Sequence, residues 1–348
     1  MKWCRFQSGA DVAYGMIEGD AVTAVTGDPF ESHTRTSKTA QLSRVKLLVP
    51  VIPPTFYAAG VNYREHVTEM AHRRGVKPEF PPQADVGYRA NNALIATDEP
   101  IVIPKDATDQ VQYEGELVVV IGKRCKRVSE AEALDCVFGV TIGNDVSERT
   151  WQRGDRTFWR GKNTDTFKPM GPWIVTGLDP DDLKVTIRLN GKEMFTYAVK
   201  DAIFGVRTFI SRMSQYLTLH PGDVLWMGTD GATENMKDGD VVEVEVPGIG
   251  VLRNPVVRAR ESWPRRPNAT PSSSAPGSRD STRCIACAGS ASRYGSTRRA
   301  KASGARGTGI AIRARAATSR AWTTRFRSPT SCSKNGAVPS VMRRSRRS

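Results

Sequence analysis

Short apolar segments alternate with turn residues along most of the chain, as far as about Arg260. Residues 12–17 and 21–26 are two such segments, and the turn residues 18–20 separate them, which predicts a hairpin. Residues 185–189 and 194–199 flank an Asn-Gly pair, the strongest short signal for a second hairpin. Further strands are predicted at 56–61, 113–121, 136–142, 224–227 and 241–246.

Helical spacing marks fewer segments. Residues 63–74 fit a helix that ends at Gly75, and residues 204–217 also have helical periodicity. Ser129 is expected to start a third helix, because Glu132 follows at the capping-box spacing. No Gly-x-Gly-x-x-Gly follows a strand, so a dinucleotide-binding fold is not indicated. Since strands outnumber helices, we expect the α+β class, rich in β-structure.

The composition changes at residue 261. Of the 51 lysines and arginines, 19 lie in residues 261–348, with only two of the 36 acidic residues, Glu261 and Asp280. This segment therefore carries a net charge of +17, whereas residues 1–260 carry −2. It is otherwise mostly Ser, Ala, Gly, Thr and Pro and cannot bury enough apolar surface to offset its ordering entropy. We expect residues 259–348 to form a disordered tail.

Two interpretations of this tail stay open. It is either a genuine basic tail that binds polyanions or the product of a reading-frame change in GC-rich coding DNA. The 17 arginines against 2 lysines, and the lack of an aromatic stacking pattern, favour the frame change. The charge balance of residues 1–260 excludes a basic nucleic-acid-binding surface there, so nucleic acid is expected only as a non-specific partner of the tail.

The chain has no stretch near the roughly 18 apolar residues that a membrane helix needs, and residues 1–11 lack the apolar part of a signal peptide. We therefore expect a soluble cytoplasmic protein without a membrane partner. The six cysteines are too scattered for a disulfide framework and are interpreted as reduced thiols. Cys284 and Cys287 have zinc-knuckle spacing, but the tail adds only Cys332 to a site that needs four ligands.

The clearest candidate for chemistry is Tyr113-Glu114-Gly115-Glu116, which leads into the apolar run 117–121. Two carboxylates at i and i+2 of a strand point to one face, about 6.6 Å apart along it. Such a pair often marks only a solvent-exposed face, as we expect for Glu243 and Glu245. Here the strand that follows is apolar on both faces. The pair therefore lies at the mouth of a buried strand, where carboxylates demand a cation.

Asp145 offers a third carboxylate where the predicted strand 136–142 ends. Three carboxylates without a cluster of cysteines or histidines select Mg²⁺ or Mn²⁺, which prefer oxygen ligands. The alternative that Asp145 is the N-cap of a helix over residues 146–153 stays open. The sequence thus predicts a divalent-metal site made of Glu114, Glu116 and Asp145.

His66 is the candidate base. On a helix, His66 and Glu69 are i and i+3, so the carboxylate can orient the imidazole and raise its basicity. A single helical histidine is often only structural. Of the other histidines, His33 and His220 lack an acid at helical spacing, and His72 precedes two arginines that disfavour its protonation.

Five segments together resemble the fumarylacetoacetate hydrolase family, in order and with compatible spacing: 62–69, 114–122, 143–148, 160–167 and 222–229. The likeness runs from about Pro54 to Val257, and residues 248–255 resemble the family's usual ending. It implies a mixed β-roll over residues 54–258, preceded by a small N-terminal β domain over residues 1–53, and usually a homodimer.

The resemblance also implies roles for single residues. It places Mg²⁺ or Mn²⁺ on the three carboxylates already named, the family's His-Glu dyad on His66 and Glu69, its active-site lysine on Lys162, and a contact with the substrate carboxylate on Thr229. Without the resemblance, Lys162 would be interpreted as a surface lysine in a polar loop. Asp165 is expected to orient Lys162, and Arg89 to bind the far carboxylate of the substrate through two hydrogen bonds.

Two positions depart from the family pattern. The family often has an aromatic residue and a lysine where this chain has Tyr88-Arg89, and usually Gly-Thr-Pro-x-Gly where it has Gly228-Thr229-Asp230-Gly231. Both positions help to shape the substrate pocket, so the specificity for the acyl group is the least transferable property.

The expected function is a divalent-metal-dependent hydrolase that cleaves a C–C bond of a 2,4-dioxo acid, an acylpyruvate or fumarylpyruvate, through a metal-stabilised enolate. His66 takes a proton from the attacking water, and Lys162 offsets developing negative charge. The same centre would serve isomerisation or hydration of 2-hydroxydienoates in aromatic catabolism, as in 5-carboxymethyl-2-hydroxymuconate delta-isomerase, or decarboxylation of oxaloacetate. The sequence does not separate these reactions. Polyanion binding through the tail is the non-enzymatic alternative.

Overall fold

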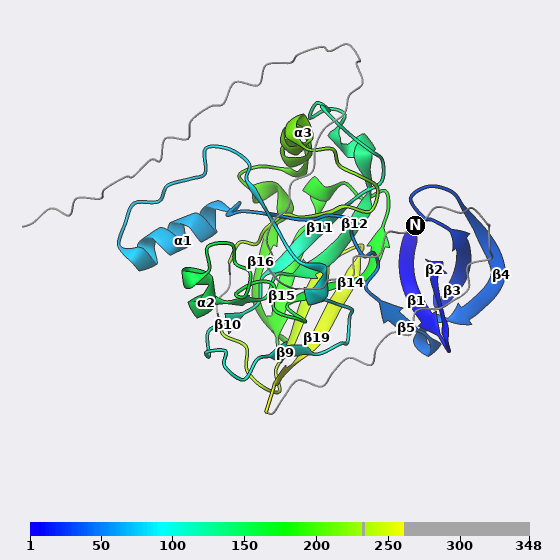
Figure 1. The fold of residues 1–348 in the computed structure, drawn as a ribbon, viewed down its shortest axis with the longest axis horizontal. Coiled ribbons are helices and arrows are strands. Elements are labelled where there is room, and N and C mark those ends of the chain that lie inside the picture. Colours follow the sequence, from blue (N-terminus) through cyan, green and yellow to red (C-terminus); the bar gives the residue numbers. More distant parts are fainter. Residues whose placement is uncertain (232–233, 261–348) are drawn as a thin grey trace, which may run out of the picture. The chain divides into compact units, whose positions relative to one another are not determined.

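The computed structural model describes residues 1–231 and 234–260 (Figure 1). The predictions for the tail, including its disorder, its polyanion binding and the Cys284–Cys287 pair, lie outside the described residues. Within the described part of the chain, no helix is both long and apolar enough to cross a membrane.

The N-terminal segment is an antiparallel meander. It consists of β1 (Lys2–Ser8), β2 (Asp11–Glu18), β3 (Ala21–Gly27) and β4 (His33–Gln41), which pair in this order, and of β5 (Lys46–Leu48), which pairs with β1. The first predicted hairpin is confirmed, because β2 and β3 pair with Glu18 opposite Ala21. β1 also pairs with β14 (Lys168–Val175), so the meander is hydrogen-bonded to the sheet that follows.

β11 (Gly115–Ile121) is buried over its whole length. The larger sheet of the described residues continues from β14 through β12 (Val137–Asn144), β11, β17 (Val224–Trp226), β6 (Phe56–Ala59) and β7 (Val86–Tyr88), with β8 (Leu94–Ile95) beside β14. Leu117 and Val119 of β11 face one hydrophobic core, and Val118 and Val120 face another. The predicted strand that is apolar on both faces is confirmed.

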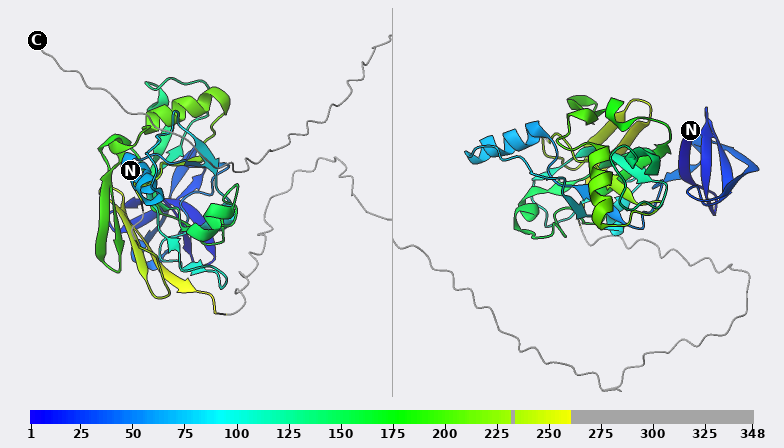
Figure 2. Two further views of the ribbon diagram at one scale, coloured as in Figure 1. Left: turned by 90° about the vertical axis from the view of Figure 1, so that its left-hand side faces the viewer. Right: turned by 90° about the horizontal axis from the view of Figure 1, so that it is seen from above.

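A second sheet packs against one face of β11. Its strands, in order, are β16 (Lys192–Ala198), β15 (Lys184–Leu189), β18 (Val241–Val246), β19 (Gly250–Arg258) and β9 (Ile101–Ile103). The green and yellow strands of this sheet lie side by side in the left view of Figure 2. The packing is close, since a Cβ atom on Gly115 would lie 2.7 Å from Cγ1 of Ile187 and 2.9 Å from Cγ1 of Val244. A short pair, β10 (Val111–Gln112) with β13 (Ser147–Glu148), lies outside both sheets.

The second predicted hairpin is confirmed as β15 and β16. Asn190 and Gly191 join these strands with φ values of 54° and 78°, as a type I′ turn requires. On β18 the buried positions alternate with half-buried Glu243 and Glu245, so this second Glu-x-Glu pair does lie on a wetter face than Glu114 and Glu116.

Two of the three predicted helices form. α1 (Arg64–Arg74) ends at Gly75, whose φ of 65° is left-handed. α3 (Val206–Tyr216) buries Phe209, Ile210 and their helical neighbours against the core between the sheets. The described residues therefore form a β-rich α+β fold, as predicted. The boundary between the predicted domains at residues 53 and 54 stays a prediction.

The helix predicted from Ser129 is wrong. The capping hydrogen bonds do form, since Ser129 donates from its backbone nitrogen and its Oγ to Oε2 of Glu132. However, only a 3₁₀ turn, Ala133–Cys136, follows them. The reason is distance along the chain, because β12 already begins at Val137 and leaves no room for further helical turns.

The alternative role of Asp145 as a helix N-cap is also wrong. α2 (Arg149–Gly154) begins later than the helix that this alternative required, and its N-cap is Glu148, which accepts a hydrogen bond from the backbone nitrogen of Trp151. The carboxylate of Asp145 is therefore not the N-cap of α2.

Candidate functional site

The pairing of β11 with β12 brings three carboxylates together. In the register of the two strands, Gly115 lies opposite Asn144. The backbone nitrogen of Glu114 donates to Oδ1 of Asn144 at 2.9 Å, and that of Asp145 donates to the carbonyl oxygen of Glu114 at 2.8 Å. Glu114, Glu116 and Asp145 are all buried, and one oxygen of each lies within 4.8 Å of the others. The three carboxylates are therefore close enough to share one cation.

Lys162 lies between two of these carboxylates. Its Nζ is 2.6 Å from Oε2 of Glu114 and 2.7 Å from Oδ2 of Asp145. Only 6% of its side chain is exposed, so the interpretation of Lys162 as a surface lysine is wrong.

Asp145 has two more cationic partners. Nη2 of Arg89 lies 2.8 Å from its Oδ2, and Nε of Arg89 lies 3.1 Å from its Oδ1. Lys168, fully buried at the start of β14, reaches Oδ1 of Asp145 at 2.7 Å and donates to the carbonyl oxygens of Val146 and Phe167. Each oxygen of Asp145 is therefore held by more than one cationic group.

Sequence reasoning missed Lys168 and Arg149. Nη1 of Arg149, on α2, lies 2.6 Å from Oε1 of Glu114, and its Nε donates to Oε1 of Gln112 at 2.8 Å. A signal for Lys168 did exist, because it is the single charged residue of an otherwise apolar strand and so needs a buried partner. No comparable signal marked Arg149.

The cations keep two of the carboxylates ionised. Burial opposes the ionisation of Glu114, but the charges of Lys162 and Arg149 outweigh it and lower its pKa to about 2. Burial likewise opposes ionisation of Asp145, and its cationic neighbours, Arg89 first, hold its pKa well below the usual value. Burial lowers the pKa of Lys168 to about 7, against the opposing effect of Asp145.

Glu116 has a different environment. Its Oε2 accepts a hydrogen bond from the backbone nitrogen of Gly228 at 2.8 Å, and no salt bridge of the described residues includes it. Burial, and then the charges of Asp145 and Glu114, raise the pKa of Glu116 to about 8. Two ionised carboxylates and a third that is buried without a salt bridge among the described residues form a set that a divalent ion would complete.

The donor set fits Mg²⁺ or Mn²⁺. The three side chains offer only oxygen atoms, and no cysteine or histidine belongs to the group. Hard divalent ions prefer such carboxylate ligands and keep water in their remaining positions. Glu114, Glu116 and Asp145 are the residues that would hold the ion.

The loop Gly228–Gly231 lies beside the His66–Glu69 pair. A Cβ atom on Gly231 would be 3.4 Å from Nδ1 of His66 and 3.6 Å from Oε2 of Glu69. Nδ1 of His66 is buried without a hydrogen-bond partner among the described residues. Burial lowers the pKa of His66, so its imidazole is neutral at pH 7 and able to accept a proton. Thr229 is buried in the same loop, where its Oγ1 donates to the carbonyl oxygen of Gly231 at 3.3 Å.

Asp165 does not orient Lys162, contrary to the prediction. It is exposed, and its Oδ1 accepts a hydrogen bond from Nδ2 of Asn92 at 2.6 Å. Among the described residues, the ion pairs of Lys162 are with Glu114 and Asp145. These two carboxylates orient the lysine.

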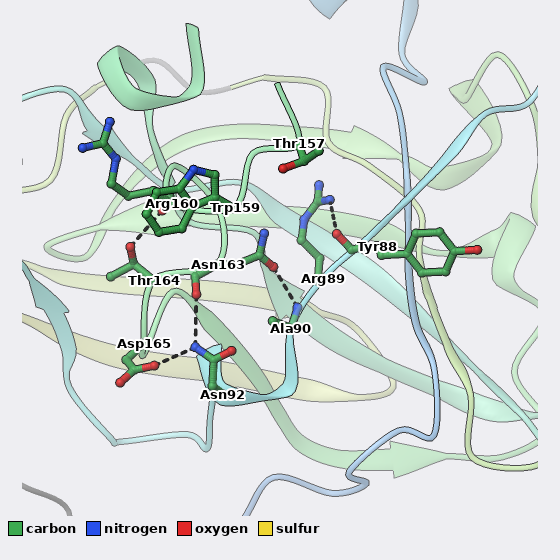
Figure 3. Close-up of a pocket in the computed structure, with 10 residues that line it drawn as sticks. All are labelled: Tyr88, Arg89, Ala90, Asn92, Thr157, Trp159, Arg160, Asn163, Thr164 and Asp165. Atoms are coloured by element: carbon green, nitrogen blue, oxygen red, sulfur yellow. Dashed lines mark hydrogen bonds between the residues drawn. The ribbon is translucent and has the colours of Figure 1, made fainter. Parts of the chain in front are cut away.

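A pocket of about 500 Å³ lies beside Arg89 (Figure 3). It is lined by Tyr88, Arg89, Ala90, Asn92, Thr157, Trp159, Arg160, Asn163, Thr164 and Asp165. Arg89 donates from Nη1 to the carbonyl oxygen of Tyr88 at 3.1 Å, while its Nε and Nη2 are engaged with Asp145. The paired donors that we expected for a substrate carboxylate are thus already used within the protein.

Comparison with known families assigns most of the described chain. The model of the domain described as "Fumarylacetoacetate (FAA) hydrolase C-terminal" matches residues 55–257, and the model described as "Rv2993c-like, N-terminal" matches residues 1–50. Protein Rv2993c of Mycobacterium tuberculosis is 38% identical over 269 residues, which are 74% of this chain and 98% of that protein.

Two further relatives have named activities. The 2,4-didehydro-3-deoxy-L-rhamnonate hydrolase of a Sphingomonas strain is 35% identical over 280 residues, 74% of this chain and 96% of that protein. The crystal structure of 5-carboxymethyl-2-hydroxymuconate delta-isomerase from Mycobacterium smegmatis is 38% identical with a TM-score of 0.68, and the match covers 74% of this chain and all of that one.

Proposed function

Because the chain belongs to the fumarylacetoacetate hydrolase family, whose members are hydrolases and isomerases, we propose that it is a divalent-metal-dependent hydrolase. Its proposed substrate is a 2,4-dioxo acid of the acylpyruvate or fumarylpyruvate type, and the C–C bond between the acyl group and the pyruvate part is the bond that breaks. The observation that carries the proposal is the buried group of Glu114, Glu116 and Asp145, whose oxygens lie within 4.8 Å of one another.

The surrounding residues supply the other parts of the reaction. Glu114, Glu116 and Asp145 would hold a divalent ion, which would supply Lewis acidity toward a 2-oxo acid. His66 acts as the general base, since its neutral imidazole can take a proton from the water that attacks the distal carbonyl carbon. Lys162 is proposed to stabilise negative charge that develops on the substrate, because its ammonium group is buried between Glu114 and Asp145, two of the residues that would hold the ion.

Two further residues belong to the proposed site. Thr229 is the proposed contact for the substrate carboxylate, and the negative charge of Glu69 raises the basicity of His66, against the larger effect of burial. The same residues would serve a second reaction, the isomerisation of a 2-hydroxydienoate, and the delta-isomerase from M. smegmatis favours this candidate. Hydrolysis differs from it in releasing pyruvate.

A turnover assay with metal control tests the proposal. The purified protein is treated with a chelator, restored with Mg²⁺ or Mn²⁺, and assayed against acetylpyruvate, fumarylpyruvate and 5-carboxymethyl-2-hydroxymuconate. We expect pyruvate release from a dioxo acid only after restoration of the metal. Isomerisation without pyruvate release would replace the hydrolase proposal by the second candidate, and turnover in chelator would contradict the metal centre.

A pair of variants connects the assay to the carboxylates. Glu116→Ala should abolish metal-dependent turnover and leave the fold intact. Glu243→Ala is the matched control, because Glu243 also belongs to a Glu-x-Glu strand segment but is half-buried and pairs with Arg253 at 3.7 Å. Equal loss of activity in both variants would show that the effect is not specific to the proposed site.

A further inference from the structure

Lys162 ends a short segment, residues 155–162, that follows α2 directly and contains turns but no regular helix or strand. We call it the lysine segment. Its backbone polar groups are not paired by a helix or a sheet, so other groups must pair them where they are buried. Nevertheless, Nζ of Lys162 lies within 2.7 Å of both Glu114 and Asp145. The contacts that fix the lysine segment therefore decide where this ammonium group lies.

The carboxylate of Asp155 holds the lysine segment from within. Its Oδ2 accepts hydrogen bonds from the backbone nitrogen of Gly161 at 2.6 Å and from that of Arg160 at 3.1 Å. These two residues directly precede Lys162. Asp155 is buried, and its Oδ1 lies 3.7 Å from Nη2 of Arg160. One buried oxygen thus fixes two consecutive peptide groups beside the lysine.

Asp155 also belongs to α2, because it is the C-cap residue of this helix. Its backbone nitrogen donates to the carbonyl oxygen of Trp151 at 2.8 Å. Gly161 lies directly against the same helix, since a Cβ atom there would be 2.8 Å from the backbone nitrogen of Gln152. A backbone contact supports this packing, because the nitrogen of Glu148 donates to the carbonyl oxygen of Gly161 at 2.9 Å. Asp155 therefore connects the lysine segment to α2 through its side chain.

α2 and the lysine segment each bring a cation to the same carboxylate. Arg149 of α2 contacts Oε1 of Glu114 through its Nη1, and Lys162 contacts Oε2 through its Nζ, both at 2.6 Å. The place of one cation relative to the other depends on how the segment is fixed to the helix. Asp155 lies at this junction, outside the group of three carboxylates that would hold an ion.

We propose that Asp155 is a positioning residue for Lys162, which fixes the lysine segment to α2 and so holds the ammonium group between Glu114 and Asp145. This inference rests on the proposed role of Lys162 in the reaction. The two backbone hydrogen bonds do the positioning, because both are short and direct, whereas the contact of Asp155 with the guanidinium group of Arg160 is long.

Three variants separate positioning from a merely structural role. Asp155→Ala removes the acceptor, and Asp155→Asn keeps one, since its amide oxygen can take the place of Oδ2. Asp240→Ala is the matched control, because Asp240 is also buried and its Oδ2 accepts from the backbone nitrogen of Lys237 at 2.8 Å, in the turn before β18. Both alanine variants should lower Tm, because each leaves a backbone N–H group without its acceptor.

Only Asp155→Ala should also lose activity. With acetylpyruvate and Mg²⁺, we expect its kcat to fall about 10- to 100-fold, as a slight misplacement of a catalytic group does, with little change in KM. Asp155→Asn should restore most of kcat, and Asp240→Ala should keep the wild-type value. The proposal would be overturned by normal kcat in Asp155→Ala, by an Asn variant as impaired as the Ala variant, or by an equal loss in Asp240→Ala.

A double-mutant cycle tests whether Asp155 acts through Lys162. In the Lys162→Met background, Asp155→Ala should reduce kcat little further, because the group that it positions is already absent. A further loss as large as that in the wild-type background would show that Asp155 acts independently of Lys162 and would overturn the proposal.

A measurement without turnover keeps the inference separate from the proposed function. Acetic anhydride is added to the metal-free protein, and acetylation of Lys162 is followed by peptide mass spectrometry, with exposed Lys123 as the internal standard. Acetylation of Lys162 should be faster in Asp155→Ala than in the wild type, Asp155→Asn and Asp240→Ala, because a displaced ammonium group leaves its two ion pairs.

This labelling decides the inference by itself if the wild type turns over none of the probe acids, an outcome that would end the proposed function. Unchanged labelling in Asp155→Ala would overturn the positioning role. If Asp155→Ala does not fold, Asp155→Ser replaces it in every comparison, because its shorter side chain draws the acceptor back from the two N–H groups.

Discussion

Nζ of Lys162 lies 2.7 Å from Oδ2 of Asp145, and both side chains are almost completely buried. The same ammonium group reaches Glu114, so a lysine of the chain already supplies positive charge to two of the three candidate metal ligands. A divalent ion at this place would share these carboxylates with Lys162. The lysine and the ion are therefore expected to stabilise the same pair of charges.

Lys162→Met should expose this relationship. Removal of one partner from a buried ion pair costs about 3–5 kcal/mol, so we expect the metal-free variant to be less stable than the wild type. Mg²⁺ should then raise the Tm of the variant more than that of the wild type, and turnover should fall about 100- to 1,000-fold because a charge-stabilising donor is lost. Thermal unfolding with and without chelator, together with the pyruvate assay, measures both effects.

Lys123→Met is the control for this variant, because Lys123 is exposed. It should behave as the wild type in both assays. A Lys162→Met protein with normal kcat would remove Lys162 from the mechanism, and one with an unchanged response to Mg²⁺ would show that lysine and metal do not act on the same carboxylates.

The raised pKa of Glu116 should make the free energy of unfolding depend on pH. Its pKa of about 8 in the folded protein lies above the ordinary value of 4.5, so between these values the folded protein binds more protons than the unfolded chain. The contribution of the protonated group is complete below about pH 4.5 and is lost as the pH rises toward 8. In chelator, we therefore expect Glu116→Gln to gain stability relative to the wild type as the pH is raised from 5 to 8.

Denaturant unfolding of the two proteins at several pH values checks this difference, and the comparison cancels the effects of other groups. Glu116→Gln should at the same time lose metal-dependent turnover, so a more stable protein would be a less active one. The interpretation of Glu116 as a buried carboxyl group would be wrong if the stability difference stayed constant across this range.

Substitution of Arg89 by lysine should change metal binding and turnover. The guanidinium group contacts both oxygens of Asp145, a geometry that a lysine cannot reproduce although it keeps the charge. We expect Arg89→Lys to change the affinity for Mn²⁺ and to lower kcat/KM about 10-fold, the effect of roughly one charged hydrogen bond. Calorimetric titration with Mn²⁺ separates the metal effect from a substrate effect. A raised KM with unchanged metal affinity would instead assign Arg89 to the substrate.

Local features of the sequence predicted the fold well. Asn190 and Gly191 predicted their hairpin because the turn needs two consecutive residues with positive φ. Gly75 predicted the end of α1 because the residue after a helix often takes the left-handed conformation, which favours glycine. Ser129 and Glu132 led to the wrong prediction of a helix, because their capping hydrogen bonds form whether or not a long helix follows. Capping is a local interaction, whereas the length of a helix depends on where the next strand begins.

The sequence pattern itself pointed to the three carboxylates and to His66, whereas Lys162 was assigned to the site only through the family resemblance. Glu114 and Glu116 could be found because they lie where an apolar strand begins, and Asp145 because it directly follows the next strand. Their cationic partners come from distant segments, and Lys168 and Arg149 reach the site through the tertiary structure alone. The orientation of Lys162 was assigned to the wrong acid, Asp165, because its two ion-pair partners come from segments distant in the sequence.

Gly231 offers the sharpest test of how closely the loop controls the base. Its φ of 144° is strained for any other residue, and a Cβ atom would approach Nδ1 of His66 to 3.4 Å. Gly239 shares the first property but not the second, since its φ is 88° and a Cβ atom there would meet nothing within 4 Å. Alanine at either position should cost about 1–3 kcal/mol of stability through backbone strain.

Only Gly231→Ala should also displace the imidazole, because the backbone strain arises in a loop that lies in van der Waals contact with it. We therefore expect kcat to fall in Gly231→Ala with little change in Mn²⁺ affinity, and to stay at the wild-type level in Gly239→Ala. Kinetics and unfolding of the two variants check this expectation together. If both variants lost stability alike and kept full turnover, the loop would not set the position of His66, and the base would have to be sought elsewhere in the site.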